Sequence, residues 1–148
     1  RPACRRSVAS RTDEARRMTT TTELIVCTTC RPPGASREGL AAGEELLDAV
    51  CWAQADGPAS AMASVRVRGV ACLGGCSRAC TVALQAPGKA SYLFGDLAPD
   101  AETARQVLQC AALHAATADG QLPRQARPER LRGGLLVRLP APLAASEA

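Results

Sequence analysis

Five cysteines fall into two closely spaced clusters, Cys27-x2-Cys30 and Cys72-x3-Cys76-x3-Cys80. Thiolates at such spacings bind soft metal ions or iron-sulfur clusters, and a Cys-x-x-Cys pair can also perform thiol-disulfide exchange. Four thiolates suit either a 2Fe-2S cluster or a zinc ion, because both accept coordination by four cysteines. All five cysteines are therefore candidate metal ligands.

Each cluster follows a segment with the pattern of a strand. Residues 24–26 form a short apolar run before Cys27, and residues 64–68 (Ser-Val-Arg-Val-Arg) alternate polar and apolar side chains before the second cluster. A helix is expected between them, over residues 38–52, with Ser36 as its cap. Residues 81–94 then read as a β-hairpin, and Pro99 opens a second helix that ends at Asp119-Gly120.

The order strand, helix, strand, cysteine loop, strand, strand, helix is the minimal thioredoxin-like arrangement. It predicts a thioredoxin-like α/β fold, with a mixed four-stranded sheet and helices packed on it. The two strands that precede the cysteine clusters would be parallel neighbours, so both loops would leave the same end of the sheet. Gly74 and Gly75 fit this, since a cluster needs close approach of the backbone, whose N-H groups can bond to its sulfurs.

The 148 residues are enough for one small domain with tails. We interpret residues 1–22 as a disordered leader, with Met18 as the true start and Cys4 as incidental. Residues 23–123 form the metal-binding domain. Residues 124–148 form a basic, proline- and arginine-rich tail, extended in conformation, whose apolar stretch 135–139 could dock on the domain.

Charge is distributed unevenly along the chain and argues against nucleic acid as a partner. Residues 1–17 carry a net +4 and residues 124–148 a net +3, whereas residues 18–123 carry −3. The basic segments lack interleaved aromatic residues. No run of eighteen apolar residues and no secretory signal is present, so we expect a cytoplasmic protein with reduced thiols and no membrane contact.

We interpret three further residues as structural rather than functional: Cys51, Cys110 and His114. Both cysteines fall on or beside apolar helix faces and are expected to pack as small core residues. His114 lies near a helix end, where interaction with the C-terminal dipole explains it without a catalytic or ligand role.

Two resemblances sharpen the metal hypothesis. The segment Gly69-Val-Ala-Cys72-Leu-Gly-Gly-Cys76, followed by a Pro-Gly hairpin, resembles the thioredoxin-like 2Fe-2S ferredoxins, whose last two ligands form a Cys-x3-Cys loop. More closely, residues 23–140 resemble a bacterial family of predicted metal-binding proteins of unknown function, whose genes often lie near cobalamin-synthesis and cobalt-handling genes. The motifs that carry this are Val26-Cys-Thr-Thr-Cys-Arg31, Cys76-Ser-Arg-Ala-Cys-Thr-Val-Ala-Leu84, Ala86-Pro-Gly-Lys89 and Phe94-Gly-Asp-Leu97.

The resemblance implies that Cys27, Cys72 and Cys76 are cluster ligands and that the fourth is Cys30 or Cys80. The two-residue spacing favours Cys30. Three functions stay open: a 2Fe-2S protein for electron transfer or redox sensing, a zinc-, cobalt- or iron-handling protein linked to cobalamin or metal metabolism, and a dithiol oxidoreductase using Cys27 and Cys30. The first two are not enzymes and need a redox or metal-receiving protein as partner. The oligomeric state is open, a homodimer included.

Overall fold

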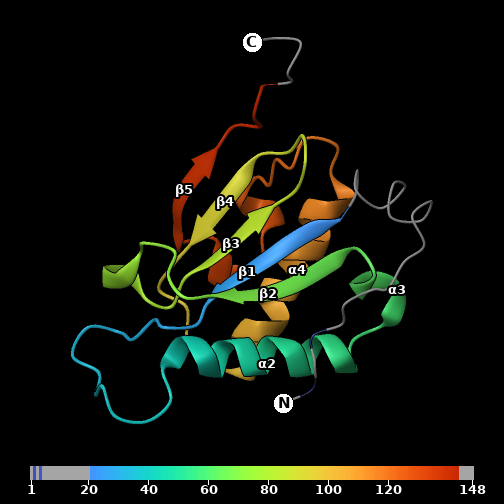
Figure 1. Cartoon of the computed structure of the whole chain (residues 1–148). Coiled ribbons are helices and arrows are strands. Elements are labelled where there is room, and N and C mark those ends of the chain that lie inside the picture. Colours follow the sequence, from blue (N-terminus) through green and yellow to red (C-terminus); the bar gives the residue numbers. More distant parts are fainter. Residues whose placement is uncertain (1, 3, 5–20, 144–148) are drawn as a thin grey trace.

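The computed structural model describes residues 2, 4 and 21–143 of the chain. Its elements in chain order are β1 (Thr22–Cys27), α2 (Ala42–Asp56), α3 (Ala59–Met62), β2 (Val65–Val70), the 3-10 turn η1 (Cys76–Arg78), β3 (Val82–Gln85), β4 (Ser91–Phe94), α4 (Ala101–Ala116), the 3-10 turns η2 (Arg124–Ala126) and η3 (Glu129–Leu131), and β5 (Leu135–Leu139) (Figure 1). No helix in this part of the chain is long and apolar enough to cross a membrane.

The strands form one mixed sheet in the order β2-β1-β3-β4-β5. β1 and β2 are parallel, with Cys27 opposite Val70, whereas β3, β4 and β5 each run antiparallel to the preceding neighbour in the sheet. The first four strands and the two long helices confirm the predicted thioredoxin-like arrangement. The number of strands was wrong, since β5 adds a fifth at the edge of the sheet.

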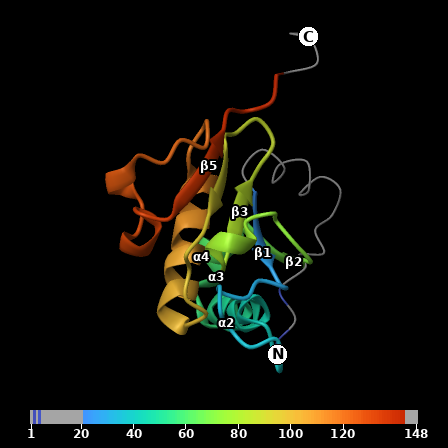
Figure 2. The ribbon, with the colours of Figure 1, turned by 90° about the vertical axis from the view of Figure 1, so that its left-hand side faces the viewer.

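Helices α2 and α4 pack against each other and against β1 and β2, beside one face of the sheet (Figure 2). The layer between them contains leucine, valine and alanine, each at most 1 % exposed: Leu24, Val26, Leu46, Val50, Ala104, Val107 and Ala111. Each buried leucine or valine side chain contributes about 2 kcal/mol to folding. The apolar face that the sequence predicts for the second helix is buried throughout.

The first helix begins later than predicted, at Ala42 rather than near Glu38. Gly39 has φ +75°, which a right-handed helix excludes. The Arg31 guanidinium donates to the carbonyls of Ser36 and Gly39, each at 2.8 Å, and holds residues 31–39 as a loop. The Ser36 hydroxyl accepts a hydrogen bond from the Glu38 amide within this loop and does not cap the helix.

The segment predicted to be an extended tail folds onto the domain. We call residues 123–141 the C-terminal arm. Pro123 and Pro128 precede η2 and η3, and β5 then pairs with β4. Arg127 is 6 % exposed and lies over the Phe94 ring, 5.9 Å from its centroid, and Arg130 donates to both carboxylate oxygens of Asp100 at 3.0 Å. These arginines therefore bind the arm to its own domain.

The leader is outside the described residues except at Pro2, Cys4, Thr21 and Thr22. Thr22 already belongs to β1. Cys4, which the sequence marked as incidental, forms a disulfide with Cys51, and their Cα atoms are 5.1 Å apart. Cys51 is buried as predicted but not free, whereas Cys110 is a free, fully buried cysteine. The expectation for Met18 falls outside the described residues.

His114 is fully buried, and the helix dipole does not account for it. Its Nε2 lies 2.7 Å from the Ala90 carbonyl and its Nδ1 2.8 Å from the Thr22 hydroxyl. A carbonyl can only accept, so Nε2 carries the proton and Nδ1 accepts from Thr22. Lys89 is the cation at the end of α4, since its Nζ donates to the carbonyls of His114 and Ala115 at 3.1 and 2.7 Å.

Replacing His114 by glutamine should flatten the dependence of stability on pH below neutrality. Burial lowers the pKa of His114, and Lys89 lowers it further, against the raising effect of the Ala90 bond. Below about pH 6.5, the ordinary histidine pKa, the unfolded chain therefore binds a proton at His114 that the folded chain does not bind. Stability is complete above about pH 6.5 and falls as pH drops towards the folded pKa. Urea unfolding of metal-free protein between pH 7.5 and 5 measures this, and equal slopes in both proteins would contradict it.

Candidate metal centre

The two cysteine loops meet because β1 and β2 are parallel neighbours. Cys27 is the last residue of β1, and β2 ends at Val70, directly before the loop that carries Cys72. The Thr28 amide donates to the Val70 carbonyl at 2.8 Å, so the loops stay in contact beyond the strands. The shared end of the sheet thus presents thiols from both loops, as the sequence predicts.

Helix α2 packs directly on the first loop at Gly43. The Gly43 amide donates to the Cys30 carbonyl at 2.9 Å, and a Cβ atom at this position would lie 2.0 Å from the Cys27 carbonyl oxygen. Only glycine therefore lets the first turn of the helix reach the backbone of both cysteines. Gly43 was not predicted to belong to the site, because a glycine in a helix looks merely destabilising.

Cys27 and Cys30 form an unequal pair of buried thiols. Burial alone would raise the pKa of Cys27, but hydrogen bonds from the Cys30 thiol and from the Leu73 and Thr29 amides outweigh it and lower that pKa. The pKa of Cys30 is raised, mainly by burial, although the Thr81 hydroxyl 3.4 Å from its sulfur opposes this. Cys27 is thus the thiol of the pair that ionises more easily.

Cys72 and Cys76 form the second pair, and both are exposed. Their sulfurs are 3.7 Å apart, and the Gly74 amide lies 3.2 Å from the sulfur of Cys72. Gly74 has φ +80°, the left-handed conformation that favours glycine in so tight a loop. Hydrogen bonding to Cys72 and its negative charge raise the pKa of Cys76.

Cys80 is separated from the surface. It is fully buried between η1 and β3, where its amide and carbonyl both bond to Leu97 at 3.2 Å. Burial raises the pKa of Cys80 to about 11, with smaller contributions from Cys30 and Cys27. A thiol in this position resists the ionisation that metal binding requires.

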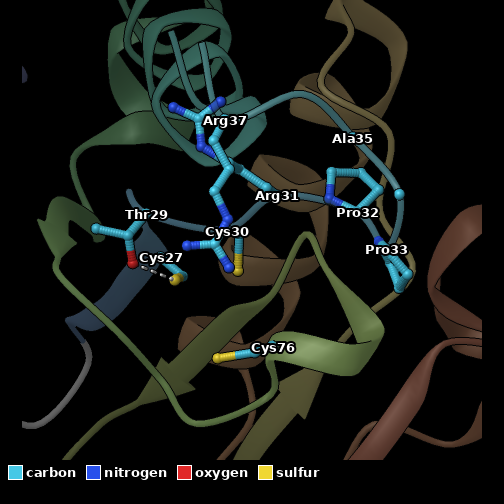
Figure 3. Close-up of a pocket in the computed structure, with 10 residues that line it drawn as sticks. Cys27, Thr29, Cys30, Arg31, Pro32, Pro33, Ala35, Arg37 and Cys76 are labelled. Carbon is cyan, nitrogen blue, oxygen red and sulfur yellow. Dashed lines mark hydrogen bonds between the residues drawn. The ribbon is translucent and has the colours of Figure 1, made fainter. Parts of the chain in front are cut away.

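A cavity of about 570 Å³ opens over the thiols (Figure 3). Cys27 and Cys30 enter it side by side from the first loop, and Cys76 enters from η1. Arg31 and Arg37 line it as well, together with the rigid Pro32-Pro33 segment. Neither Cys72 nor Cys80 is among the lining residues, but Cys72 is exposed with its sulfur 3.7 Å from that of Cys76, whereas Cys80 is buried. Arg31, Arg37 and Thr81 are site residues that the sequence analysis missed, and only their proximity to a cysteine cluster could have indicated them.

The donor set fits a group held by two pairs of thiolates. Sulfur ligands suit iron-sulfur clusters and zinc, and each pair comes from one loop. Within residues 2, 4 and 21–143, no three histidine, cysteine or acidic side chains are grouped closely enough to hold one ion.

Topology and thiols together define a small α/β protein with a thioredoxin-like sheet and a candidate cysteine metal centre. The chain belongs to the family described as "Protein of unknown function (DUF1636)", whose model matches residues 24–141. A thioredoxin-like [2Fe-2S] ferredoxin from Aquifex aeolicus is similar in structure, with 21% sequence identity and a TM-score of 0.41, over 55% of this chain and 74% of that chain. No curated protein matches the chain.

Proposed function

We propose that this protein carries a 2Fe-2S cluster on Cys27, Cys30, Cys72 and Cys76 and serves in electron transfer or redox sensing. The observation that carries the proposal is the arrangement of these thiols as two pairs, one on each of two loops at one end of the sheet. A binuclear cluster takes two protein thiolates per iron. Each loop would therefore supply both ligands of one iron.

The spacing of the second pair supports this assignment. Two thiolates on one tetrahedral metal, with metal-sulfur bonds of about 2.3 Å, lie about 3.8 Å apart. The sulfurs of Cys72 and Cys76 are 3.7 Å apart. This loop can thus take up a metal with little movement.

Backbone and charged groups around the thiols suit an anionic group. The amides of Gly74 and Leu73 are directed at the sulfurs of Cys72 and Cys27, and Arg31 and Arg37 line the same cavity. Hydrogen bonds to sulfur and nearby positive charge favour the more negative, reduced state of such a cluster. The exposed side of Cys72 and Cys76 faces solvent, where a redox partner protein would dock. We place the protein in a reducing compartment such as the cytoplasm, where Cys27, Cys30, Cys72 and Cys76 stay free; the Cys4–Cys51 disulfide is the exception to the reduced state that such a compartment favours.

Anaerobic purification with metal and sulfide analysis tests the proposal. We expect a brown protein with about two iron atoms and two inorganic sulfides per chain. A colourless chain with one zinc ion, or a chain with one cobalt ion and no inorganic sulfide, would overturn it and favour the role in metal handling. Treatment with a chelator should remove the colour and lower the melting temperature, because cluster binding stabilises the folded state.

The unequal pKa values of Cys27 and Cys30 favour a second candidate, a dithiol oxidoreductase. The Cys27 thiolate would attack a substrate disulfide and release one thiolate, and Cys30 would then displace the second thiolate while closing a Cys27–Cys30 disulfide. Reduction of insulin by metal-free protein tests this. Activity that survives Cys27→Ser would exclude it.

A further inference from the structure

The C-terminal arm touches the segment that follows β4 at Gly95. The Gly95 amide donates to the Gly134 carbonyl at 2.8 Å. A Cβ atom at Gly134 would lie 2.6 Å from the Gly95 carbonyl oxygen, so the two backbones are in direct contact. This contact joins the start of β5 to the segment that follows β4.

Leu136 extends the contact towards the cysteines. The register between β4 and β5 shifts at this point, since Leu93 pairs with Val137 and Phe94 with Leu135, which leaves Leu136 without a partner residue. A Cβ atom at Gly95 would lie 2.7 Å from Leu136 Cδ1, and one at Gly75 would lie 3.7 Å from the same atom. The Leu136 side chain therefore covers Gly95 and reaches the residue directly before Cys76.

Residues 95–97 in turn hold the end of the loop that spans Cys72 to Cys80. The Asp96 amide donates to the Arg78 carbonyl at 2.6 Å, and Arg78 Nε donates to the Asp96 carboxylate at 2.9 and 3.0 Å. The Arg78 amide closes η1 by donating to the Gly75 carbonyl at 2.9 Å. A continuous path of backbone contacts thus leads from the arm through residues 95–97 to the turn that carries Cys76.

We propose that Leu136 is a positioning residue for Cys76, and that the C-terminal arm holds η1 where its thiol can pair with Cys72. The contact itself is independent of any bound group. Its consequence for cluster binding rests on the proposed function. Loss of the Leu136 side chain should therefore loosen the Cys72–Cys76 loop and leave the Cys27–Cys30 loop, which α2 holds, in place.

Backbone hydrogen exchange of the metal-free protein tests the contact. Leu136→Ala should speed exchange about tenfold at residues 75–80 and 95–97. The Leu136 side chain packs on these residues, and without it they unfold locally at a lower free-energy cost. Exchange in β1 and α2 should stay unchanged. Leu139→Ala is the matched control, since Leu139 is on the same strand but 58 % exposed. No change in residues 75–80, or a uniform rise throughout the chain, would overturn the inference.

A second pair of variants keeps the test independent of the loss of packing. In Gly95→Ala the new Cβ would lie 2.7 Å from both the Arg78 carbonyl oxygen and Leu136, whereas Gly133→Ala meets nothing within 4 Å. Gly95→Ala should therefore increase exchange at residues 75–80, and Gly133→Ala should not. Leu136→Met should restore the protection from exchange that Leu136→Ala removes.

Measurements on protein that carries the cluster distinguish a failure of this inference from a failure of the proposed function. The visible absorbance of the cluster should decay about tenfold faster in Leu136→Ala than in Leu139→Ala. If no cluster is found but the exchange pattern appears, the proposed function fails and the positioning role stands. If the cluster is present and neither decay nor exchange changes, the positioning role fails.

Discussion

Cys30→Ala should lose the cluster, whereas Cys80→Ala should keep about two irons per chain. Both residues are buried cysteines, so the variants are a matched pair. Cys30 lines the cavity beside Cys27, whereas Cys80 lies outside the lining and has a pKa raised to about 11. A metal ionises a thiol only where the sulfur can reach it, and of these two cysteines only Cys30 lines the cavity in which a metal would bind.

Iron analysis and the visible spectrum after identical anaerobic preparation measure this difference. Each variant loses one buried sulfur, at a cost of about 1 kcal/mol, so stability alone should not separate them. Urea unfolding of the metal-free forms checks that point. Loss of iron in Cys80→Ala, with iron retained in Cys30→Ala, would make Cys80 the fourth ligand.

Gly43→Ala should destabilise the protein by about 3 kcal/mol and impair the site, although alanine normally favours a helix. The new Cβ would lie 2.0 Å from the Cys27 carbonyl oxygen and 3.0 Å from the Cys30 amide nitrogen. Both obstacles are backbone atoms, which cannot rotate away. The helix must therefore retreat and break the hydrogen bond from Gly43 to the Cys30 carbonyl.

Urea unfolding measures the free energy of unfolding. Iron content measures whether the Cys27–Cys30 loop still binds the cluster. Gly133→Ala is the control, because it has open space around its Cβ and should stay within about 0.5 kcal/mol of the parent. A Gly43→Ala protein as stable as Gly133→Ala would show that α2 does not press on the cysteine loop.

Much of the candidate site could be predicted from local patterns. The apolar run in residues 24–26 and the alternation in residues 64–68 are strong strand signals, and the parallel pairing of β1 and β2 confirms them. Which thiols converge follows from that pairing. That Cys30 lines the cavity and Cys80 does not could not be predicted, because it depends on contacts with Thr81 and Leu97 that spacing alone cannot reveal.

The start of the first helix shows where local signals misled. Ser36 followed by Glu38 looks like a capped helix, yet Arg31 bonds to the carbonyls of Ser36 and Gly39 and keeps the segment as a loop. Hydrogen bonds from a side chain to the backbone compete with helix formation. Whether the segment becomes helix or loop depends on where the rest of the fold anchors it.

The sequence by itself determined the order of the first four strands along the chain, the apolar face of the second helix and the identity of the clustered thiols. These features depend on periodicity and spacing within one segment. The tertiary structure alone decided that residues 135–139 pair with β4 as a fifth strand, that Lys89 rather than His114 interacts with the end of α4, and that Gly43 must be glycine. Each of these depends on residues distant in the chain, because the charges and the free space around a residue are defined only once those distant residues pack against it.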